Sequence, residues 1–399
     1  MATEPRPARR VAAALLAFAL ALRAPGAGRA RADETDAHQQ ADEPSVSSFD
    51  LRLGWFEQDG HGFQSQTQPS GKPGSERATI VQPMALFRIR QGKHVQHTLV
   101  IPVDIVTAAS PDALDAISSA SQRNEAAGID MTTAIAAGVN DFVIRWGVHV
   151  EEPLRAGNWG AAWTRHLAED NATVTLSGNA SFDYFDNISQ EGYTDEQRSR
   201  VAANANLGAS QILSPTTLVD GSYGITYQVG VLEQTWNAVP RGPMRVPLGE
   251  KFPHQRTRHA LFGRVAQMVP LTHTTLKLAY RYYVDDFGLS AHTVELRAYQ
   301  YLSRWLVVRG SWRFHTQTGV DFYTENAVNL MTGPLTPRTA DSDLGPFDAD
   351  ELGVKLMLLP RRAPWPWLRP HSFALSYERY TRDNGLSMDV LALEWGQEL

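Results

Sequence analysis

The stretch Ala-Thr-Val-Thr-Leu-Ser-Gly-Asn-Ala-Ser-Phe-Asp-Tyr, residues 172–184, alternates apolar and polar side chains from end to end. Successive side chains of a β-strand point to opposite faces, so this period of two predicts a strand with one apolar and one polar face. Strands of soluble proteins usually have about five or six residues. A strand of this length therefore favours the wall of a barrel over a soluble sandwich.

The same alternation recurs along the chain from Phe49 onward, and its polar face includes full charges. Further examples are residues 141–150, 219–231, 276–285 and 306–315. Burying lysines and arginines in a packed sandwich would cost several kcal/mol each unless they were paired. A closed barrel avoids this cost because lipid covers the apolar face and water reaches the other. We therefore predict an all-β fold, a single antiparallel transmembrane β-barrel, with a soluble β-sandwich as the structural alternative.

Connection lengths predict the number of strands, because bacterial barrels alternate short periplasmic turns with longer outer loops. Short turns are expected at 91–93, 214–215, 270–271 and 303–304, and long polar connections at 58–77, 107–140, 185–196, 232–255 and 317–349. The alternation predicts about 14 strands, within a range of about 12–16, and periplasmic N- and C-termini. A strand at 160–168, inside the long segment 151–170, would change this count.

The N-terminus has the three parts of an export signal. A basic segment lies between Arg6 and Arg10, an apolar segment runs from Val11 to Leu22, and Ala30 to Ala32 has the small-x-small pattern of a cleavage site. The apolar segment is shorter than the roughly 20 residues that a membrane-spanning helix needs. We therefore predict that residues 1–32 are a cleaved signal peptide and that the protein is exported to the outer membrane.

The remaining chain shows no boundary between domains apart from its acidic beginning. Residues 33–47 are expected to form an acidic, disordered periplasmic leader. Residues 48–399 are expected to form the barrel, with long outer loops near 107–140, 232–255 and 317–349.

Composition excludes several classes of function. The chain contains no cysteine, which excludes a disulfide scaffold, thiolate chemistry, a lipid-anchored lipoprotein and cysteine-ligated zinc. Without residues 1–32 the chain has 31 basic and 42 acidic residues, and this balance argues against binding to nucleic acid. The 12 histidines form no His-Glu-x-x-His motif, so metalloprotease chemistry has no support.

Three stretches are similar to one bacterial family. The run Leu-Ala-Tyr-Arg-Tyr-Tyr-Val-Asp-Asp-Phe-Gly at 278–288, followed by 291–296, resembles the family catalogued as domain of unknown function 3570. Residues 103–111 with 115–122, and the start of a strand at 256–260, resemble the same family. The resemblance implies an outer-membrane β-barrel, and it implies no activity because the family has none assigned.

Charged residues of both signs share the face that is expected to line the lumen. The cations are Arg52, Arg88, Arg145, Lys277, Arg281, Arg297, Arg309, Arg313 and Lys355, and the acids are Asp104, Asp183, Asp220, Glu295, Glu351 and Glu378. Such a mixture forms either a transverse field that guides polar solutes or a salt-bridged interior that closes the pore. The sequence leaves both alternatives open.

Two acidic groups are candidate ligand sites. Asp285, Asp286 and His292, together with Glu295, have the chemistry of a hard-cation site or of a mixed oxygen and nitrogen site. Asp-Asp-x-Gly is also ordinary turn chemistry, and a polar outer turn is the preferred interpretation. The second group contains Asp104, Asp112, Asp115, Ser110, Ser118, Ser119 and Ser121. We expect these residues to cap a short helix at 111–127 or to lie in a solvated loop, and we assign no metal and no cofactor.

Three hypotheses of function follow from these sequence features, and the first two involve no catalysis. The first is a porin-like channel for small polar or charged solutes, with loops 107–140 and 317–349 constricting its mouth. The second is a non-conducting structural or accessory barrel that anchors a periplasmic redox or metal-handling partner through its leader and residues 151–170. The third, a hydrolase at the barrel rim, lacks a serine or aspartate paired with histidine at a diagnostic spacing. Expected partners are outer-membrane lipid, lipopolysaccharide and the barrel-assembly machinery during insertion.

Overall fold

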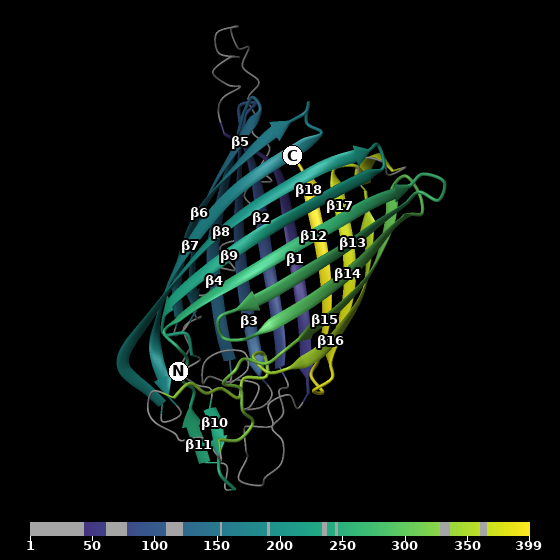
Figure 1. The fold of residues 1–399 in the computed structure, drawn as a ribbon. Helices are drawn as coiled ribbons and strands as arrows, with labels where there is room; N and C mark the ends of the chain where they lie inside the picture. Colours follow the sequence, from purple (N-terminus) through teal and green to yellow (C-terminus); the bar gives the residue numbers. More distant parts are fainter. Residues whose placement is uncertain are drawn as a thin grey trace, which may run out of the picture.

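Sixteen antiparallel strands form one closed barrel in the computed structural model (Figure 1). The structure describes residues 44–60, 78–108, 123–151, 154–189, 192–233, 238–243, 246–327, 336–359 and 365–399. The first strand pairs with both the second and the last strand, which closes the ring. Phe49 of the first strand lies opposite Phe87 of the second strand on one side and opposite Gln397 of the last strand on the other. Closure pairs the backbone of every strand on both sides, which lipid requires because it offers no hydrogen bonds.

The strands of the barrel are joined in sequence order, apart from a two-stranded hairpin between β9 and β12. The barrel strands are β1 Ser45–Asp59, β2 Ala78–Gln91, β3 Val95–Ala108, β4 Arg123–Ala137, β5 Asn140–Glu151, β6 Leu154–Leu167, β7 Ala172–Ser189, β8 Gly192–Ser214, β9 Thr217–Gly230, β12 Gln255–Val269, β13 Thr274–Asp285, β14 Ser290–Tyr301, β15 Leu306–Gln317, β16 Phe347–Leu358, β17 His371–Arg382 and β18 Ser387–Glu398. The hairpin is β10 Ala238–Arg241 and β11 Val246–Gly249, and a short 3-10 helix, η2, spans Pro366–Leu368.

Side chains alternate between the two faces of the barrel wall. On β8, Leu207 is 54% exposed and lies opposite Leu176 and Tyr223, which are also exposed. The preceding residue, Asn206, faces the other way and lies opposite Ser177. Large apolar side chains are exposed in the same way on strands all around the ring. An apolar outer surface of this extent needs lipid rather than water around it, so the protein is a membrane-spanning barrel.

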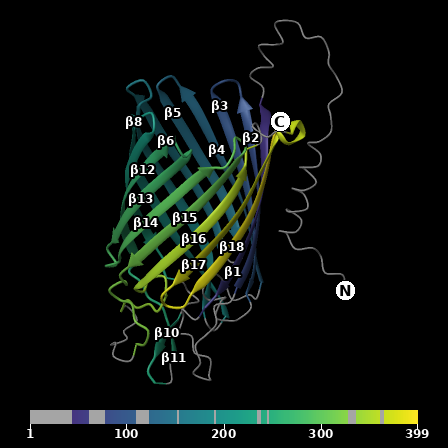
Figure 2. The ribbon, with the colours of Figure 1, turned by 90° about the vertical axis from the view of Figure 1, so that its right-hand side faces the viewer.

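The two ends of the barrel differ in their connections (Figures 1 and 2). At the turn end, tight turns such as Gly138–Val139 join the strands, and the C-terminal Leu399 N donates a hydrogen bond to Ser47 O at 3.0 Å. At the loop end lie the β10–β11 hairpin and the segment 318–346 between β15 and β16. The start of β1 and the end of the chain therefore lie together at the turn end.

The barrel has sixteen strands where the alternation predicts about 14, inside the expected range. The two additional strands are β4, within the segment 107–140 where the sequence predicts a single loop, and β6, within 151–170. Both strands carry many alanines, glycines and threonines on both faces, which blurs the apolar-polar alternation. Backbone pairing with the long neighbouring strands makes both segments strands, although the apolar-polar alternation in their own sequences is weak.

The predicted leader and barrel overlap at β1. This strand begins at Ser45, and the Ser47 hydroxyl donates a hydrogen bond to Arg88 O at 3.1 Å, so the end of the 33–47 leader belongs to the barrel wall. The predicted signal peptide, residues 1–32, lies outside the described residues. Of the predicted helix at 111–127, residues 111–122 also lie outside the described residues, and residues 123–127 belong to the strand β4. Within the described part of the chain, no helix is long and apolar enough to cross a membrane.

Adjacent residues on β8 test the assignment of the two faces. Replacing the outward Leu207 with arginine should lower the free energy of unfolding in lipid vesicles by about 2–4 kcal/mol, because the charge is moved into hydrocarbon. Asn206→Arg places the same side chain in the lumen and should cost much less. Urea titrations of the two variants provide the comparison, and equal losses would contradict the assignment.

Candidate functional site

Two segments at the loop end fold onto each other and form what we call the loop cap, the described residues of 231–254 and 318–346. Lys251 and Arg338 exchange two backbone hydrogen bonds of 3.1 and 2.7 Å, and Ala327 N donates to Pro240 O at 2.7 Å. Arg338 also donates from Nε to the backbone oxygen of Gly249 at 2.9 Å. The cap is therefore a paired structure built from two separate connections.

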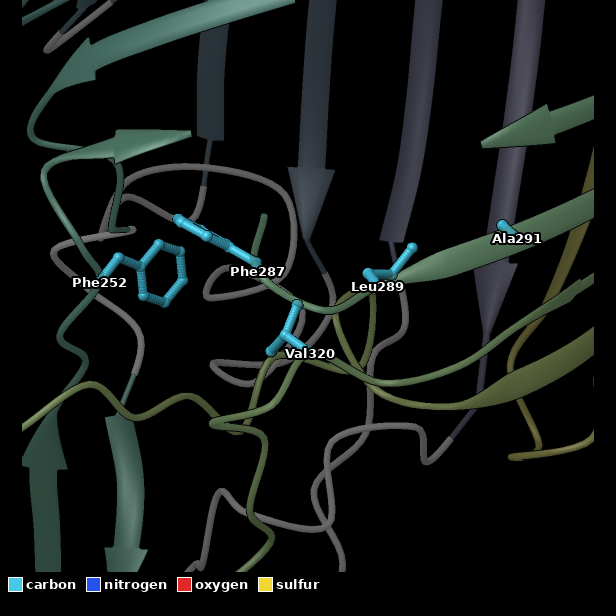
Figure 3. Packing of buried hydrophobic residues seen from close by; sticks show 5 residues of the cluster. All are labelled: Phe252, Phe287, Leu289, Ala291 and Val320. Atoms are coloured by element: carbon cyan, nitrogen blue, oxygen red, sulfur yellow. The ribbon is translucent and has the colours of Figure 1, made fainter. Parts of the chain in front are cut away.

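The loop cap has an apolar core that continues onto the barrel wall. Phe252, Phe287, Leu289, Ala291 and Val320 are buried together, and the strands from the start of the chain pass behind them in Figure 3. Ala291 lies on the inward face of β14, opposite the inward Tyr283 of β13. Because the cap buries an inward-facing residue, it lies against the inner surface of the mouth.

A second attachment extends the loop cap along the mouth. The Gln317 side chain donates from Nε2 to the backbone oxygens of Asp343 and Gly345, at 2.9 and 2.7 Å. Arg382, on the inward face of β17, forms an ion pair of 2.6 Å with Asp343. The segment around Asp343 therefore spans from β15 to β17 and narrows the loop end of the lumen.

Asp285 fixes the turn on which the loop cap rests. Its side chain is fully buried, and its Oδ2 accepts hydrogen bonds from Arg256 Nε at 2.9 Å and from the Tyr283 hydroxyl at 2.6 Å. Its Oδ1 accepts from the backbone N–H groups of Phe287 and Leu289, at 3.0 and 3.1 Å. A buried carboxylate is tolerated when it is paired and hydrogen-bonded in this way.

The structure does not assemble the cation site considered for Asp285, Asp286 and His292. Both oxygens of Asp285 are occupied by donors, and Asp286 accepts a hydrogen bond from Thr257 N at 2.9 Å. His292 lies on the outward face and interacts with the Tyr280 hydroxyl at 2.7 Å. The run forms a turn, and no group of three metal-binding side chains occurs among the residues described. The side chain of Asp104, and all of the other acids and serines of the second candidate group, lie outside the described residues.

Eight of the fifteen charged residues predicted to face the lumen lie together on the inward face of β13–β16. They are Lys277, Arg281, Glu295, Arg297, Arg309, Arg313, Glu351 and Lys355. We call the inward face of β13–β17 the cationic sector. Arg145, by contrast, lies on β5, eight strands from β15 around the ring and therefore on the opposite wall.

Ion pairs of the cationic sector run along the wall. Arg313 Nη1 is 3.3 Å from Glu351, Arg309 Nη2 is 2.7 Å from Glu378, and Lys355 Nζ is 2.6 Å from Glu394. Each pair joins strands that are neighbours or next neighbours in the ring. The pairs therefore stiffen and partly neutralise the wall and do not bridge the lumen.

The opposite wall, β6–β9, carries short and mostly uncharged inward side chains over most of its length. A row across these strands contains Gly160, Asn179, Asn204 and Thr226, and the next contains Ala162, Ser177, Asn206 and Gly224. Such side chains fill little of the interior. The lumen is consequently asymmetric, with long cationic side chains on one side and short neutral ones on the other.

A cavity of about 450 Å³ lies where the cationic sector meets the loop cap. Its charged lining is mixed, with Arg313 and Arg382 beside Asp343, Glu351 and Glu378, and its other lining residues include His315, Phe347 and Tyr380. The Arg382 guanidinium stacks over the Phe347 ring, 4.1 Å from its centroid. Arg382 and Tyr380 are not among the residues predicted from the sequence, although both share the period of two with the predicted Glu378.

A closed, lipid-facing ring of long antiparallel strands around a charged interior defines a membrane β-barrel of the outer-membrane type. The chain belongs to the family described as protein of unknown function (DUF3570), whose model matches residues 164–385. This confirms the resemblance seen in the sequence. The matched region contains both Arg256 and Asp285, so two of the stretches that carried the resemblance meet in one buried ion pair.

Solved barrels give weaker similarities. A structure titled bacterial polysaccharide outer membrane secretin is 8% identical with a TM-score of 0.48, and covers 88% of this chain and 98% of its own. OpdK from Pseudomonas aeruginosa with vanillate is 9% identical with a TM-score of 0.43, covering 88% and 99%. A BenF-like porin from Pseudomonas fluorescens Pf-5 is 8% identical with a TM-score of 0.46, covering 89% and 99%. No curated protein matches the sequence. At these values the similarities assign no function to this chain.

The buried pair between Arg256 and Asp285 should decide whether the loop cap stays folded. Arg256→Gln leaves a fully buried carboxylate without its cation, so the cap should lose about 3–5 kcal/mol of local stability. Limited proteolysis should then cut within the cap much faster than in the parent protein. Arg264→Gln breaks the more exposed pair with Asp220, and should cost at most about 1 kcal/mol. Equal protease resistance of the two variants would contradict the role of Asp285.

Asp341 should make the loop cap sensitive to pH. Burial, with the neighbouring Asp343 carboxylate as a second cause, raises the pKa of Asp341 to about 6. The neutral carboxyl therefore favours the folded cap, and this stabilisation is present at low pH and is lost as pH rises through about 6. Hydrogen exchange of cap amides, corrected for intrinsic rates, should be slower at about pH 5 than at about pH 7.5. Asp341→Asn should weaken this difference, and an unchanged difference would contradict the prediction.

Proposed function

We propose that the protein is a porin-like channel of the outer membrane that passes small polar or charged solutes. The observation that supports this most directly is the lumen of a sixteen-stranded barrel with short, neutral side chains along β6–β9. Barrels of eight strands are filled by their own side chains, whereas those of about 16–18 strands leave an aqueous channel. The ion pairs of the opposite wall run along that wall and not across the lumen, which also supports a channel.

In this proposal the loop cap sets the size limit of the channel. It covers the inner surface of the mouth at Ala291 and reaches Arg382 through Asp343. Loops that fold into a lumen restrict which solutes pass while the barrel itself stays wide.

The proposal also orients the chain in the membrane. The turn end, with Ser45 and Leu399, would face the periplasm, and the loop cap would face outward, as in bacterial barrels with short periplasmic turns. Residues 1–32 would direct export, the barrel-assembly machinery would insert the chain, and lipopolysaccharide would surround the loop end.

A non-conducting structural or accessory barrel is the second candidate, because the cap has its own buried core at the mouth. If the cap closes the lumen fully, the barrel would act as an anchor for an envelope partner. Conductance separates the two candidates.

Planar-bilayer recording tests the channel directly. The purified full chain should give discrete conductance steps, and replacing residues 320–344 with a short glycine-serine linker should raise the step size at least about twofold, because the cap narrows the mouth. A shift in gel mobility on boiling shows that both proteins are folded barrels. Silence of both folded proteins across salts and voltages would contradict the channel and favour the accessory barrel.

A further inference from the structure

The wall formed by β6–β9 carries a group of amide and hydroxyl side chains on its inward face, which we call the amide patch. Its members are Asn158, Ser177, Asn179, Ser181, Asn204, Asn206 and Thr226. Asn179 lies opposite Asn204 on the neighbouring strand, which in turn lies opposite Thr226. The patch is therefore one continuous surface across four strands, near the middle of β7 and β8.

Much of the hydrogen-bonding capacity of the amide patch is unused. Asn204 donates from Nδ2 to the Thr226 hydroxyl at 2.8 Å. Within the described part of the chain, the side chains of Asn179, Asn206 and Ser177 form no hydrogen bond with another residue. A side-chain amide has two donors and an acceptor oxygen, and a hydroxyl both donates and accepts. The patch therefore presents free donors and acceptors side by side to the lumen.

Many charged groups elsewhere on the lumen wall are engaged with each other. In the cavity beside Phe347, two guanidiniums face three carboxylates, and both guanidiniums form ion pairs with them. Glu394 is 3.8 Å from Arg52 Nε and 2.6 Å from Lys355 Nζ. A charged solute would have to displace such partners, whereas a neutral polar solute can use the free groups of the amide patch.

Two arginines border the amide patch. Arg145 lies opposite Gly160 on the β5 side, and Arg258 lies opposite Thr226 on the β12 side. A guanidinium donates hydrogen bonds to hydroxyl oxygens as well as to carboxylates, so these residues can extend a site for either kind of solute. Probes that share one body and differ in charge separate the two.

We propose that the amide patch binds neutral polyhydroxylated solutes such as sugars. The inference rests on the proposed channel and names the class of solute that the channel would pass. Each sugar hydroxyl is a donor and an acceptor, so it can replace the water on an amide or hydroxyl of the patch without leaving either group unpaired. An apolar solute would leave these groups unpaired, and an ion would find no counter-charge within the patch.

Ligand-observed NMR on the purified full chain tests the patch without requiring conduction. The protein is held in an amine-oxide detergent, which carries no sugar, and the probe is maltotriose. Magnetisation should transfer from the protein to maltotriose, and glucose should displace it at a concentration at least about threefold lower than its anionic and cationic analogues, glucuronate and glucosamine. Absence of transfer, equal displacement by the three competitors, or preferred displacement by either charged analogue would overturn the proposal.

Nearly isosteric variants locate the site on the wall. Asn179→Leu and Asn206→Leu each remove donors and an acceptor at nearly constant shape, and each should weaken maltotriose binding about fivefold. Gln96→Met makes the same kind of change on the inward face of β3, outside the patch, and should leave binding nearly unchanged. Gel mobility before and after boiling shows that each variant is folded. An equal loss in the Gln96 variant would mean that maltotriose contacts the lumen wall at no particular site, and would overturn the proposal.

The two proposals fail in different ways. A barrel that is silent in bilayers but binds maltotriose through Asn179 and Asn206 would refute the channel and keep the site. Conductance steps without sugar binding that depends on these two residues would keep the channel and refute the site.

Discussion

The need to pair every backbone N–H and C=O group in a lipid environment determines the rest of this structure. Lipid accepts no hydrogen bonds, so β1 must find β18 as well as β2, and the sheet must close. Closure then divides every strand into a lipid-facing and a lumen-facing row, as Leu207 and Asn206 show. Because the outer row is apolar over most of its length, the features that distinguish this protein from other barrels lie in the inner row and in the connections at the loop end. The charges that would be prohibitively costly in a packed sandwich are tolerated here because water reaches them.

The loop end is organised around the buried carboxylate of Asp285. Hydrogen bonds from four residues to this carboxylate fix the turn after β13, and the apolar side chains of that turn, Phe287 and Leu289, pack against the loop cap. The contact that shapes the mouth is therefore built from the same stretch that carries the family resemblance. A mouth held by a buried ion pair is stiff, whereas ion pairs nearer the turn end, such as Arg313 with Glu351, are more exposed to the lumen. This contrast fits a rigid mouth at the loop end and more mobile side chains on the lumen wall.

The sequence alone was sufficient for the class of fold and for the inward row, because a period of two is a local property. It missed β4 and left β6 open as a possible strand at 160–168, because alanines and glycines such as Gly128 and Gly160 make the two faces of these strands look alike. It also left open whether the lumen charges form a field or a closed network. That question depends on register, which brings Lys355 to Glu394 across an intervening strand. Of the loop cap, only the lengths of its two connections could be predicted. Side-chain contacts within the cap, such as Phe252 with Phe287, produce no periodic pattern in the sequence. The excess of cations on β13–β17 became visible only when the strands were placed side by side.

The most direct test of lipid coverage of the apolar row is a spin-label scan across β8 in lipid vesicles, which the absence of cysteine from the chain makes simple. Single cysteines introduced one at a time at positions 203–209 would be labelled, and their collision rates with oxygen and with a water-soluble nickel chelate compared. We predict strict alternation, with oxygen favoured at 203, 205, 207 and 209 and the nickel chelate favoured at 204, 206 and 208. Uniform rates along the strand, or alternation in the opposite phase, would show that lipid does not cover the apolar row and would contradict a membrane-spanning barrel.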